Sequence, residues 1–132
     1  MFTDADFVHT YTRAQALADG VLVDATTVAR EAGFTIPLAL TSAAWAECVA
    51  WSPADTEKTG VPQDEAGRLW DVVWMASCAA RRHRDGGADR VAFEVFRVPR
   101  GRRRALRCAL VLHIGPGDDG APVLTVLLPD ED

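Results

Sequence analysis

The sequence predicts an α+β fold, in which short N-terminal helices and one long central helix pack on a C-terminal three-stranded antiparallel meander. Two observations carry this prediction. Apolar residues follow the helical period of about 3.6 residues between about residues 64 and 84, and the strand period of two from residue 91 onward. Helices that precede the main strands are typical of α+β folds. The 132 residues, 48% of them hydrophobic, are predicted to form a single domain over residues 1–132.

The N-terminal region is predicted to hold two short helices with a short strand between them. Thr12 and Gln15 have the spacing of a capping box, which begins a helix, and Gly20 suits the position that ends it. The apolar run over residues 21–23 predicts a strand that would extend the meander. A second short helix follows and ends at Gly33.

The next region is predicted to alternate between extended and helical structure. Residues 34–40 are apolar and contain Pro37, which favours either an extended segment at a sheet edge or a linker. Thr41 suits the cap of a helix that would run through Trp51. Residues 56–63 are predicted to form a polar loop.

The longest helix is predicted from about Asp64 to Arg84. Asp64 and Glu65 suit the positive end of its dipole, and the arginines at its other end suit the negative end. Apolar residues cover a wide arc of this helix, which places it at the centre of the fold. Asp64 and Arg68 are spaced for an ion pair, and Asp71 shares their face. With Glu65, these side chains either stabilise the helix or position a substrate.

Three strands joined by short turns are predicted to form the meander. They span Val91–Val98, Ala105–Ile114 and Val123–Leu128. The period of two places on one face of the first strand Val91, Phe93 and Val95, and on one face of the second Leu106, Cys108, Leu110, Leu112 and Ile114. Residues 129–132 are predicted to be a frayed acidic tail.

Charge is distributed unevenly along the chain, whose formal net charge is −5. Residues 81–107 hold ten arginines and three acidic residues, a net charge of +7. By contrast, residues 1–80 have a net charge of −7 and residues 108–132 one of −5. The overall acidity argues against a general nucleic-acid-binding protein. The asymmetry predicts two faces of opposite potential that can steer charged partners.

The sequence points to the cytoplasm. No apolar run approaches the roughly 18 residues needed to cross a bilayer, so no membrane partner is expected. The first ten residues contain two aspartates and no basic residue, unlike a secretory signal. Cys48, Cys78 and Cys108 lie far apart and lack the close spacing of zinc ligands. We expect them to be small buried hydrophobic side chains rather than metal ligands or a redox site.

The sharpest feature is a cluster of arginines around one turn between two predicted strands. Arginine matches phosphate geometry, so the cluster would bind nucleic acid or dock on an acidic protein; the alternative is a solvated turn. No aromatic residue interleaves the arginines, so base stacking on this element is not expected. The hairpin arginines are Arg97, Arg100, Arg102, Arg103, Arg104 and Arg107, and the end of the long helix adds Arg81, Arg82 and Arg84.

A second constellation is His113 followed by a glycine-rich loop with Asp118 and Asp119. A histidine beside paired carboxylates can bind a divalent metal or perform acid–base work, with Glu65 or Asp71 as a further member. The alternative is that both aspartates only shape turns through their own backbone. Phosphate-loop, dinucleotide-binding and zinc-protease motifs are absent, so no cofactor and no metal are expected.

The four tryptophans, Trp45, Trp51, Trp70 and Trp74, are expected to pack in the core because a chain of this size needs bulky side chains there. Tryptophan is also enriched at interface hot spots. An exposed Trp51 or Trp70 would therefore favour a protein-binding patch.

Three stretches of the sequence resemble a family of short uncharacterised proteins encoded on bacterial plasmids, integrative elements and phages. They are Tyr11–Ala16 with Asp19–Asp24, Gln63–Val72 and Leu112–Gly120. The resemblance covers nearly the whole chain and implies an accessory protein of mobile elements, a kind that often acts on host or phage components, defence systems included. It implies no particular catalytic residue.

The leading hypothesis is a non-enzymatic protein that binds a host or phage protein or nucleic acid through charged surfaces, in a role that includes counter-defence. The alternative is a small metal-dependent hydrolase built on His113 and the loop of Asp118 and Asp119. A self-associating structural protein is the third hypothesis, and the sequence leaves the oligomeric state open.

Overall fold

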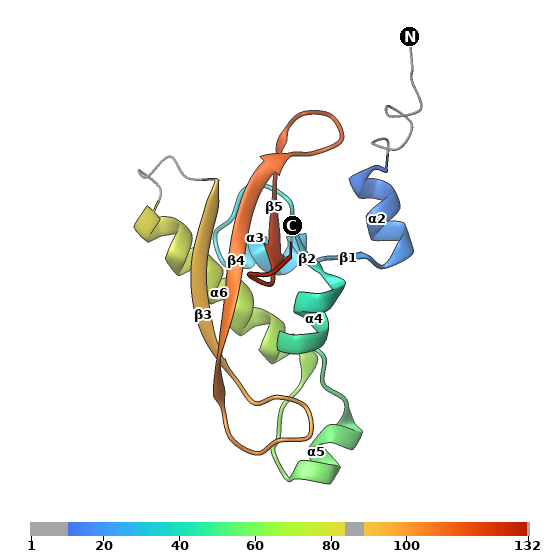
Figure 1. Cartoon of the computed structure of the whole chain (residues 1–132), viewed down its shortest axis with the longest axis vertical. Coiled ribbons are helices and arrows are strands. Elements are labelled where there is room, and N and C mark those ends of the chain that lie inside the picture. Colours follow the sequence, from blue (N-terminus) through green and yellow to red (C-terminus); the bar gives the residue numbers. More distant parts are fainter. Residues whose placement is uncertain (1–10, 84–88, 132) are drawn as a thin grey trace.

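A computed structural model describes residues 11–83 and 89–131, which form the α+β fold that the sequence predicts (Figure 1). Their sheet has five strands in the order β1-β2-β5-β4-β3. β2 and β5 are parallel, and every other neighbouring pair is antiparallel. The strands are β1 (Leu22–Asp24), β2 (Leu38–Thr41), β3 (Arg90–Arg97), β4 (Leu106–Pro116) and β5 (Pro122–Leu127).

The predicted C-terminal meander is confirmed, since β3, β4 and β5 are successive antiparallel neighbours. The predicted buried face is confirmed for Phe93, Leu110 and Leu112, which are all buried. Leu106 and Ile114 belong to the same alternation but are exposed, because they lie toward the two ends of β4, beyond its buried middle.

The prediction of an edge segment or linker over residues 34–40 is wrong for its second half. β2 lies inside the sheet, between β1 and β5, and Leu38, Ala39 and Leu40 are buried. Pro37 precedes the strand, so its missing N–H removes no bond from the ladder. Its carbonyl accepts a hydrogen bond from the Leu124 backbone N–H, at 2.8 Å. The parallel pairing of β2 with β5 therefore joins the two halves of the chain in one sheet.

The short helices begin where the sequence supplies caps. The capping box of Thr12 and Gln15 is present at the start of α2. Ser52 and Asp55 form a second box at the start of α5, which ends at Gly60 with φ of 77°. The prediction of a polar loop from residue 56 is therefore wrong as far as residue 59. The helices are α2 (Arg13–Asp19), α3 (Thr26–Glu31), α4 (Ser42–Cys48), α5 (Pro53–Thr59) and α6 (Glu65–His83).

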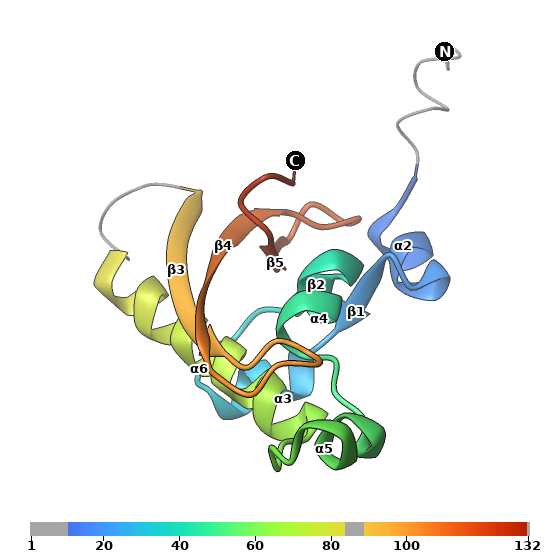
Figure 2. The ribbon, with the colours of Figure 1, turned by 60° about the horizontal axis from the view of Figure 1, so that its bottom comes forward.

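α6 covers the inner face of the sheet, as predicted for the long central helix. Figure 2 shows α3 and α6 on the same side of the strands. Val72, Val73 and Ala76 are fully buried in the core that α6 shares with the sheet, which includes Leu40 and Val126. A fully buried valine or leucine contributes roughly 1.5–3 kcal/mol, so this layer stabilises much of the fold.

The end of the described chain folds back over the outer face of the sheet. Glu131 accepts hydrogen bonds from the Thr41 hydroxyl, at 2.7 Å, and from the Leu128 backbone N–H, at 2.8 Å. The prediction of a frayed tail over residues 129–132 is therefore wrong for Glu131, which is held by the hydroxyl of Thr41 at the end of β2. Residue 132 lies outside the described residues.

Candidate binding surface

Three large aromatic side chains are exposed together on one side of the molecule. Trp70 and Trp74 on α6 are 37% and 39% exposed, and their rings stack with centroids 5.8 Å apart. Phe96 on β3 is 67% exposed. Core packing holds for Trp51, which is buried and donates from Nε1 to the Thr56 hydroxyl at 2.9 Å. The expectation that the tryptophans fill the core is wrong for Trp70 and Trp74, and an exposed Trp70 favours a protein-binding patch.

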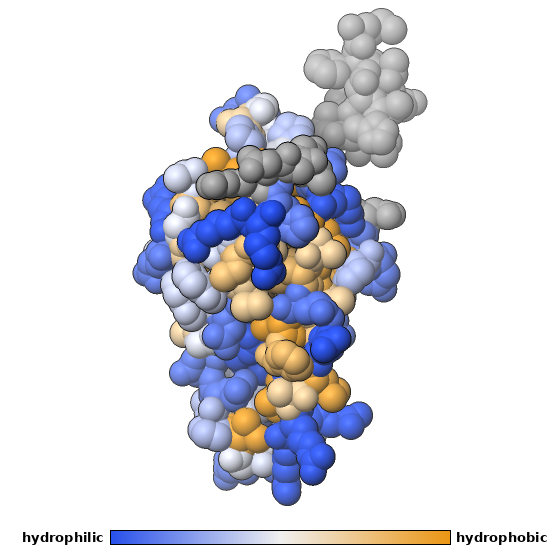
Figure 3. Space-filling model, turned by 90° about the vertical axis from the view of Figure 1, so that its left-hand side faces the viewer, coloured by the Kyte–Doolittle hydropathy of each residue, from blue (hydrophilic) through white to orange (hydrophobic). Residues whose placement is uncertain are grey.

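A groove of about 810 Å³ lies between α6 and β3, beside these aromatic side chains. Figure 3 views this side of the molecule and shows apolar side chains gathered in a strip with hydrophilic ones on either side. The groove is lined from α6 by Asp71, Trp74, Met75 and Arg82, from β3 by residues 92–96, and from β4 by Arg107 and Ala109.

The backbone of β3 is open along the groove. Among the described residues, β3 pairs only with β4. The Ile114 N–H donates to the Asp89 carbonyl at 2.9 Å. In an antiparallel pair, residues whose backbone groups bond to the partner strand alternate with residues whose backbone groups point away from it, so this bond shows which residues of β3 bond to β4. The N–H and C=O groups of odd-numbered residues therefore face β4, whereas those of Ala92, Glu94 and Phe96 face outward. These outward groups can pair with another extended chain.

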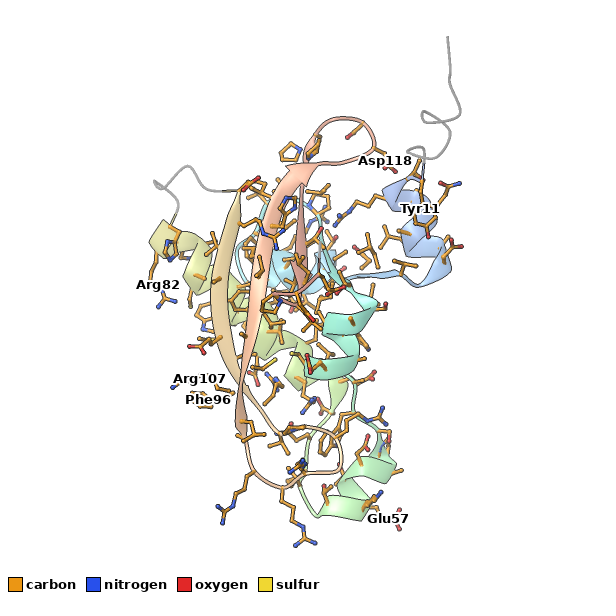
Figure 4. The ribbon with its side chains drawn as sticks, viewed as in Figure 1. Tyr11, Glu57, Arg82, Phe96, Arg107 and Asp118 are labelled. Atoms are coloured by element: carbon orange, nitrogen blue, oxygen red, sulfur yellow. The ribbon has the colours of Figure 1, made fainter. Side chains whose placement is uncertain are left out.

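Arginines surround the same groove. Arg107 lies over the Phe96 ring at 5.9 Å, and its Nε is 3.6 Å from a Glu94 carboxylate oxygen. Arg81 lies over the Trp74 ring at 5.3 Å, and Arg82 has no ion pair within the described residues. Figure 4 shows Arg82, Phe96 and Arg107 on the same side of the molecule. We call the groove, the outward edge of β3, these arginines and the three exposed aromatic side chains the β3 surface.

Arg81 and Arg107 each have an aromatic side chain beside them. The sequence predicts no aromatic residue interleaved among the hairpin arginines, and the structure places the Phe96 ring of β3 beside Arg107 of β4, its register partner. Trp74 and Arg81 are seven residues apart on α6, so their contact follows the helical period. A cation over an aromatic face is attracted by its quadrupole. The Phe96 ring thus orients the Arg107 guanidinium beside the groove, whereas the Arg81 guanidinium donates to the Ala32 carbonyl, at 3.2 Å.

The predicted hairpin cluster divides into arginines with different environments. Arg97 is only 4% exposed, and its guanidinium pairs with Asp71 at 3.4 Å, so it does not join an exposed patch. The alternation of β3 explains this, since Arg97 follows Phe93 and Val95 on the buried face. Arg100 pairs with Asp55 at 2.9 Å. Within the hairpin, Arg102, Arg103 and Arg104 are exposed and have no ion pair among residues 11–83 and 89–131; Arg84 lies outside the described residues.

Arg68 anchors the end of β3 to the helices. It is 2% exposed and donates at 2.9 Å to the carbonyls of both Val49 and Val98, so the predicted ion pair with Asp64 does not form. Asp64 instead accepts from the Gly67 backbone N–H, at 2.7 Å. Burial, and then the charge of Arg97, lower the pKa of Arg68.

The residues of the predicted metal site are dispersed. Asp118 accepts from the backbone N–H groups of Arg13 and Ala14, at 2.7 and 3.0 Å, and so holds the start of α2. Asp119 accepts from a backbone N–H in its own turn. Glu65 accepts from the Trp51 N–H, and Asp71 belongs to the ion pair with Arg97. No group of three or more histidine, cysteine, aspartate or glutamate side chains within the described residues could hold a metal ion.

His113 lies instead in a cleft of about 430 Å³ on the outer face of the sheet. The strand register aligns it with Arg90 on β3 and Thr125 on β5, neighbours that sequence spacing could not reveal. A Cβ at Gly115 would approach the imidazole Cε1 to 2.8 Å, so a glycine makes room for this ring. The described lining of this cleft includes His113 and Arg90 but not the pair of aspartates, Asp118 and Asp119, that the predicted metal site requires.

The fold and the β3 surface together define an α+β protein with one open, arginine-lined sheet edge. Residues 1–132 match a family of unknown function, DUF6573, and the chain belongs to that family. No curated protein matches the chain, and no solved structure matches it either. In the part of the chain that the structure describes, no helix is long and apolar enough to cross a membrane.

Proposed function

We propose that this chain is a non-enzymatic binding protein that takes an acidic, extended segment of a partner protein as an added strand along β3. The observation that carries the proposal is the outward-facing backbone of Ala92, Glu94 and Phe96 beside exposed aromatic side chains. Added strands draw affinity from main-chain hydrogen bonds and specificity from alternate side chains.

Charge determines which segments fit. Both acidic side chains in the lining of the groove, Asp71 and Glu94, already pair with arginines. Arg82 retains an unmatched positive charge among the described residues, and Arg81 lies over Trp74. Carboxylates on an incoming strand would meet the Arg82 guanidinium, which lines the groove, whereas a basic segment would be repelled.

The aromatic side chains supply apolar contact area for the same segment. Tryptophan and arginine are enriched among the residues that dominate binding energy at interfaces. Trp74 and Phe96 lie on either side of the groove, so alternate apolar side chains of an added strand would meet both. A second copy of this chain fits less well, because it would bring its own arginines against Arg82 and Arg107.

The resemblance to plasmid, integrative-element and phage proteins supports a host or phage protein as the partner, in the cytoplasm, where counter-defence is one role for such a complex. Arg102, Arg103 and Arg104 lie at the β3–β4 turn and would extend the positive field beyond the groove. A long-range field raises association rates and weakens with salt. The alternative of a metal-dependent hydrolase is less well supported, because the fold does not bring His113, Asp118 and Asp119 together with Glu65 or Asp71.

Labelled peptides of the length of β3 test the proposal. One alternates glutamate with valine, and its counterpart alternates lysine with valine. We expect the acidic peptide to bind at least about tenfold more tightly at low salt, by fluorescence anisotropy. On binding, amide hydrogen exchange should slow at Ala92, Glu94 and Phe96, whose N–H groups face outward. Equal binding of the two peptides, or no measurable binding, would overturn the proposal.

Matched variants separate the β3 surface from the rest of the molecule. Replacing Trp74 and Phe96 with Ala should weaken acidic-peptide binding by about tenfold or more. Tyr11→Ala removes an exposed aromatic side chain that lies away from Phe96 (Figure 4) and outside the lining of the groove, and it should leave binding unchanged. The triple change of Arg102, Arg103 and Arg104 to Ala should slow association without changing the fold. If single-stranded DNA bound more tightly than the acidic peptide, with a steep salt dependence, the partner would be nucleic acid instead.

A further inference from the structure

The fold brings together two cysteines that are far apart in the sequence. Cys48 is the last residue of α4, and Cys108 lies in β4. Their Sγ atoms are 2.9 Å apart, and both thiols are free. A disulfide bond has an S–S length of about 2.05 Å, so the two sulfurs need to close by only about 0.9 Å to bond.

The two thiols differ in their access to solvent. Cys48 is fully buried, whereas Cys108 is half-buried and lines a pocket of about 400 Å³. Burial, and then a hydrogen bond with Cys108, raise the pKa of the Cys48 thiol. Cys108 is therefore the thiol that a small reagent reaches first, and Cys48 is held neutral behind it.

We propose that Cys48 and Cys108 form an oxidation site that reacts with hydrogen peroxide to give an intramolecular disulfide. In the first step the Cys108 sulfur attacks one peroxide oxygen, the O–O bond breaks, and Cys108 becomes a sulfenic acid while water leaves. In the second step the Cys48 sulfur attacks the Cys108 sulfur, the S–O bond breaks, and the hydroxyl group leaves as water with the thiol proton. Peroxide is reduced, and the two thiols are oxidised by two electrons.

The disulfide would tie α4 to β4. Cys108 is the register partner of Val95 on β3, so the bond would form directly beside the strand that carries the open edge. It would also close a loop that contains α5, α6 and β3, which lie between the two cysteines in the chain. Closing a loop of this size restricts the unfolded chain and raises the melting temperature. This inference is independent of the proposed peptide-binding function.

Peptide mapping of the peroxide-treated wild-type chain tests the proposal directly. We expect two of the three thiols to disappear, a mass loss equal to two hydrogen atoms, and a linked peptide pair that contains Cys48 and Cys108. A reductant should restore all the thiols. The melting temperature of the oxidised chain should rise by roughly 10 °C. A Cys78 product, or sulfinic acid at Cys108 without a linked pair, would overturn the proposal.

Single variants assign the order of the steps. Cys48→Ser should stop the reaction at a sulfenic acid on Cys108 that a sulfenic-acid probe traps. Cys108→Ser should leave Cys48 reduced under the same treatment, because its thiol is fully buried. Cys78→Ser is the matched control and should form the disulfide at the wild-type rate. A trapped sulfenic acid on Cys48 in place of Cys108 would contradict the order, and the wild-type map does not depend on how these variants fold.

Discussion

The two edges of the sheet are built very differently. At the β1 edge the strand has three residues, and α2 lies next to it (Figure 1). The bond from the Ala25 N–H to the Leu38 carbonyl leaves only Leu22 and Asp24 facing outward along β1. At the β3 edge the strand has eight residues and no further element pairs with it in the described part of the chain.

The difference identifies the edge that is available to a partner. Open strand edges invite pairing with other chains, and proteins usually shorten, cover or charge them. The β1 edge is short and has a helix beside it. The β3 edge is long and lies beside exposed Trp74 and Phe96, and in the proposed complex its arginines would favour an acidic strand. One sheet thus combines a short edge beside a helix with a long edge that, in the described part of the chain, is unpaired.

The largest expected effect tests whether the outward and inward backbone groups of β3 alternate as inferred. Val91→Pro removes an N–H that faces β4 and should lower the free energy of unfolding by about 2–4 kcal/mol. Ala92→Pro removes an outward N–H, and should change the free energy of unfolding by less than about 1 kcal/mol while weakening binding of the acidic peptide. Urea unfolding of both variants measures the difference. Equal losses would mean that the β3 edge is not open.

A smaller effect is expected at the opposite edge. Asp118→Ala removes the carboxylate that accepts the first N–H groups of α2, and should lower the free energy of unfolding by about 1 kcal/mol. Amide exchange should quicken in α2 and β1 and stay unchanged in β3. Asp119→Ala, which removes the neighbouring carboxylate, is the control and should leave α2 unaffected. Faster exchange in β3 would contradict the independence of the two edges.

Local patterns were enough to predict the β3–β4–β5 half of the sheet and the long helix. The alternation of apolar and polar residues predicted the strands. The charged residues at both ends of α6 and the wide arc of apolar residues along it predicted that helix. The place of β2 could not be predicted, because Leu38–Thr41 pairs in parallel with a strand more than eighty residues later in the chain. Antiparallel neighbours are often joined by a short turn that can be recognised in the sequence, whereas parallel strands are joined by a long connection without such a signal.

For the β3 surface, the sequence predicted the type of residue, arginine, but not the arrangement of the side chains. The sequence placed arginines near one turn, but local spacing did not say which would be exposed. Arg97 is buried because the alternation of β3 places it on the inner face of the sheet, where it pairs with Asp71. Arg68 donates to the Val49 and Val98 carbonyls, and the ion pair predicted from its helical spacing does not form. The approach of Phe96 to Arg107 and of Cys48 to Cys108 arises from contacts between different elements, which local spacing does not show. Trp74 and Arg81 instead lie seven residues apart on α6.

The smallest expected effect concerns how the β3 end of the molecule is held. A backbone hydrogen bond from Ser52, and then a hydrogen bond from Arg100, lower the pKa of Asp55 below its ordinary value. A carboxyl group with a depressed pKa in the folded state stabilises the protein above its unfolded pKa, near 3.8, and that stabilisation is lost as the pH falls through the folded pKa. The melting temperature of wild type should therefore exceed that of Asp55→Asn by a few degrees at about pH 7, and the gap should narrow as the pH falls below about 4. Glu57→Gln on the same helix is the control, because its side chain points to solvent (Figure 4) and it should show no gap at either pH. A constant gap across this range would mean that the Asp55 charge does not hold α5 to the β3–β4 turn. The end of the open edge would then be positioned by the hydrogen bond from Arg68 to the Val98 carbonyl and by the ion pair of Arg97 with Asp71.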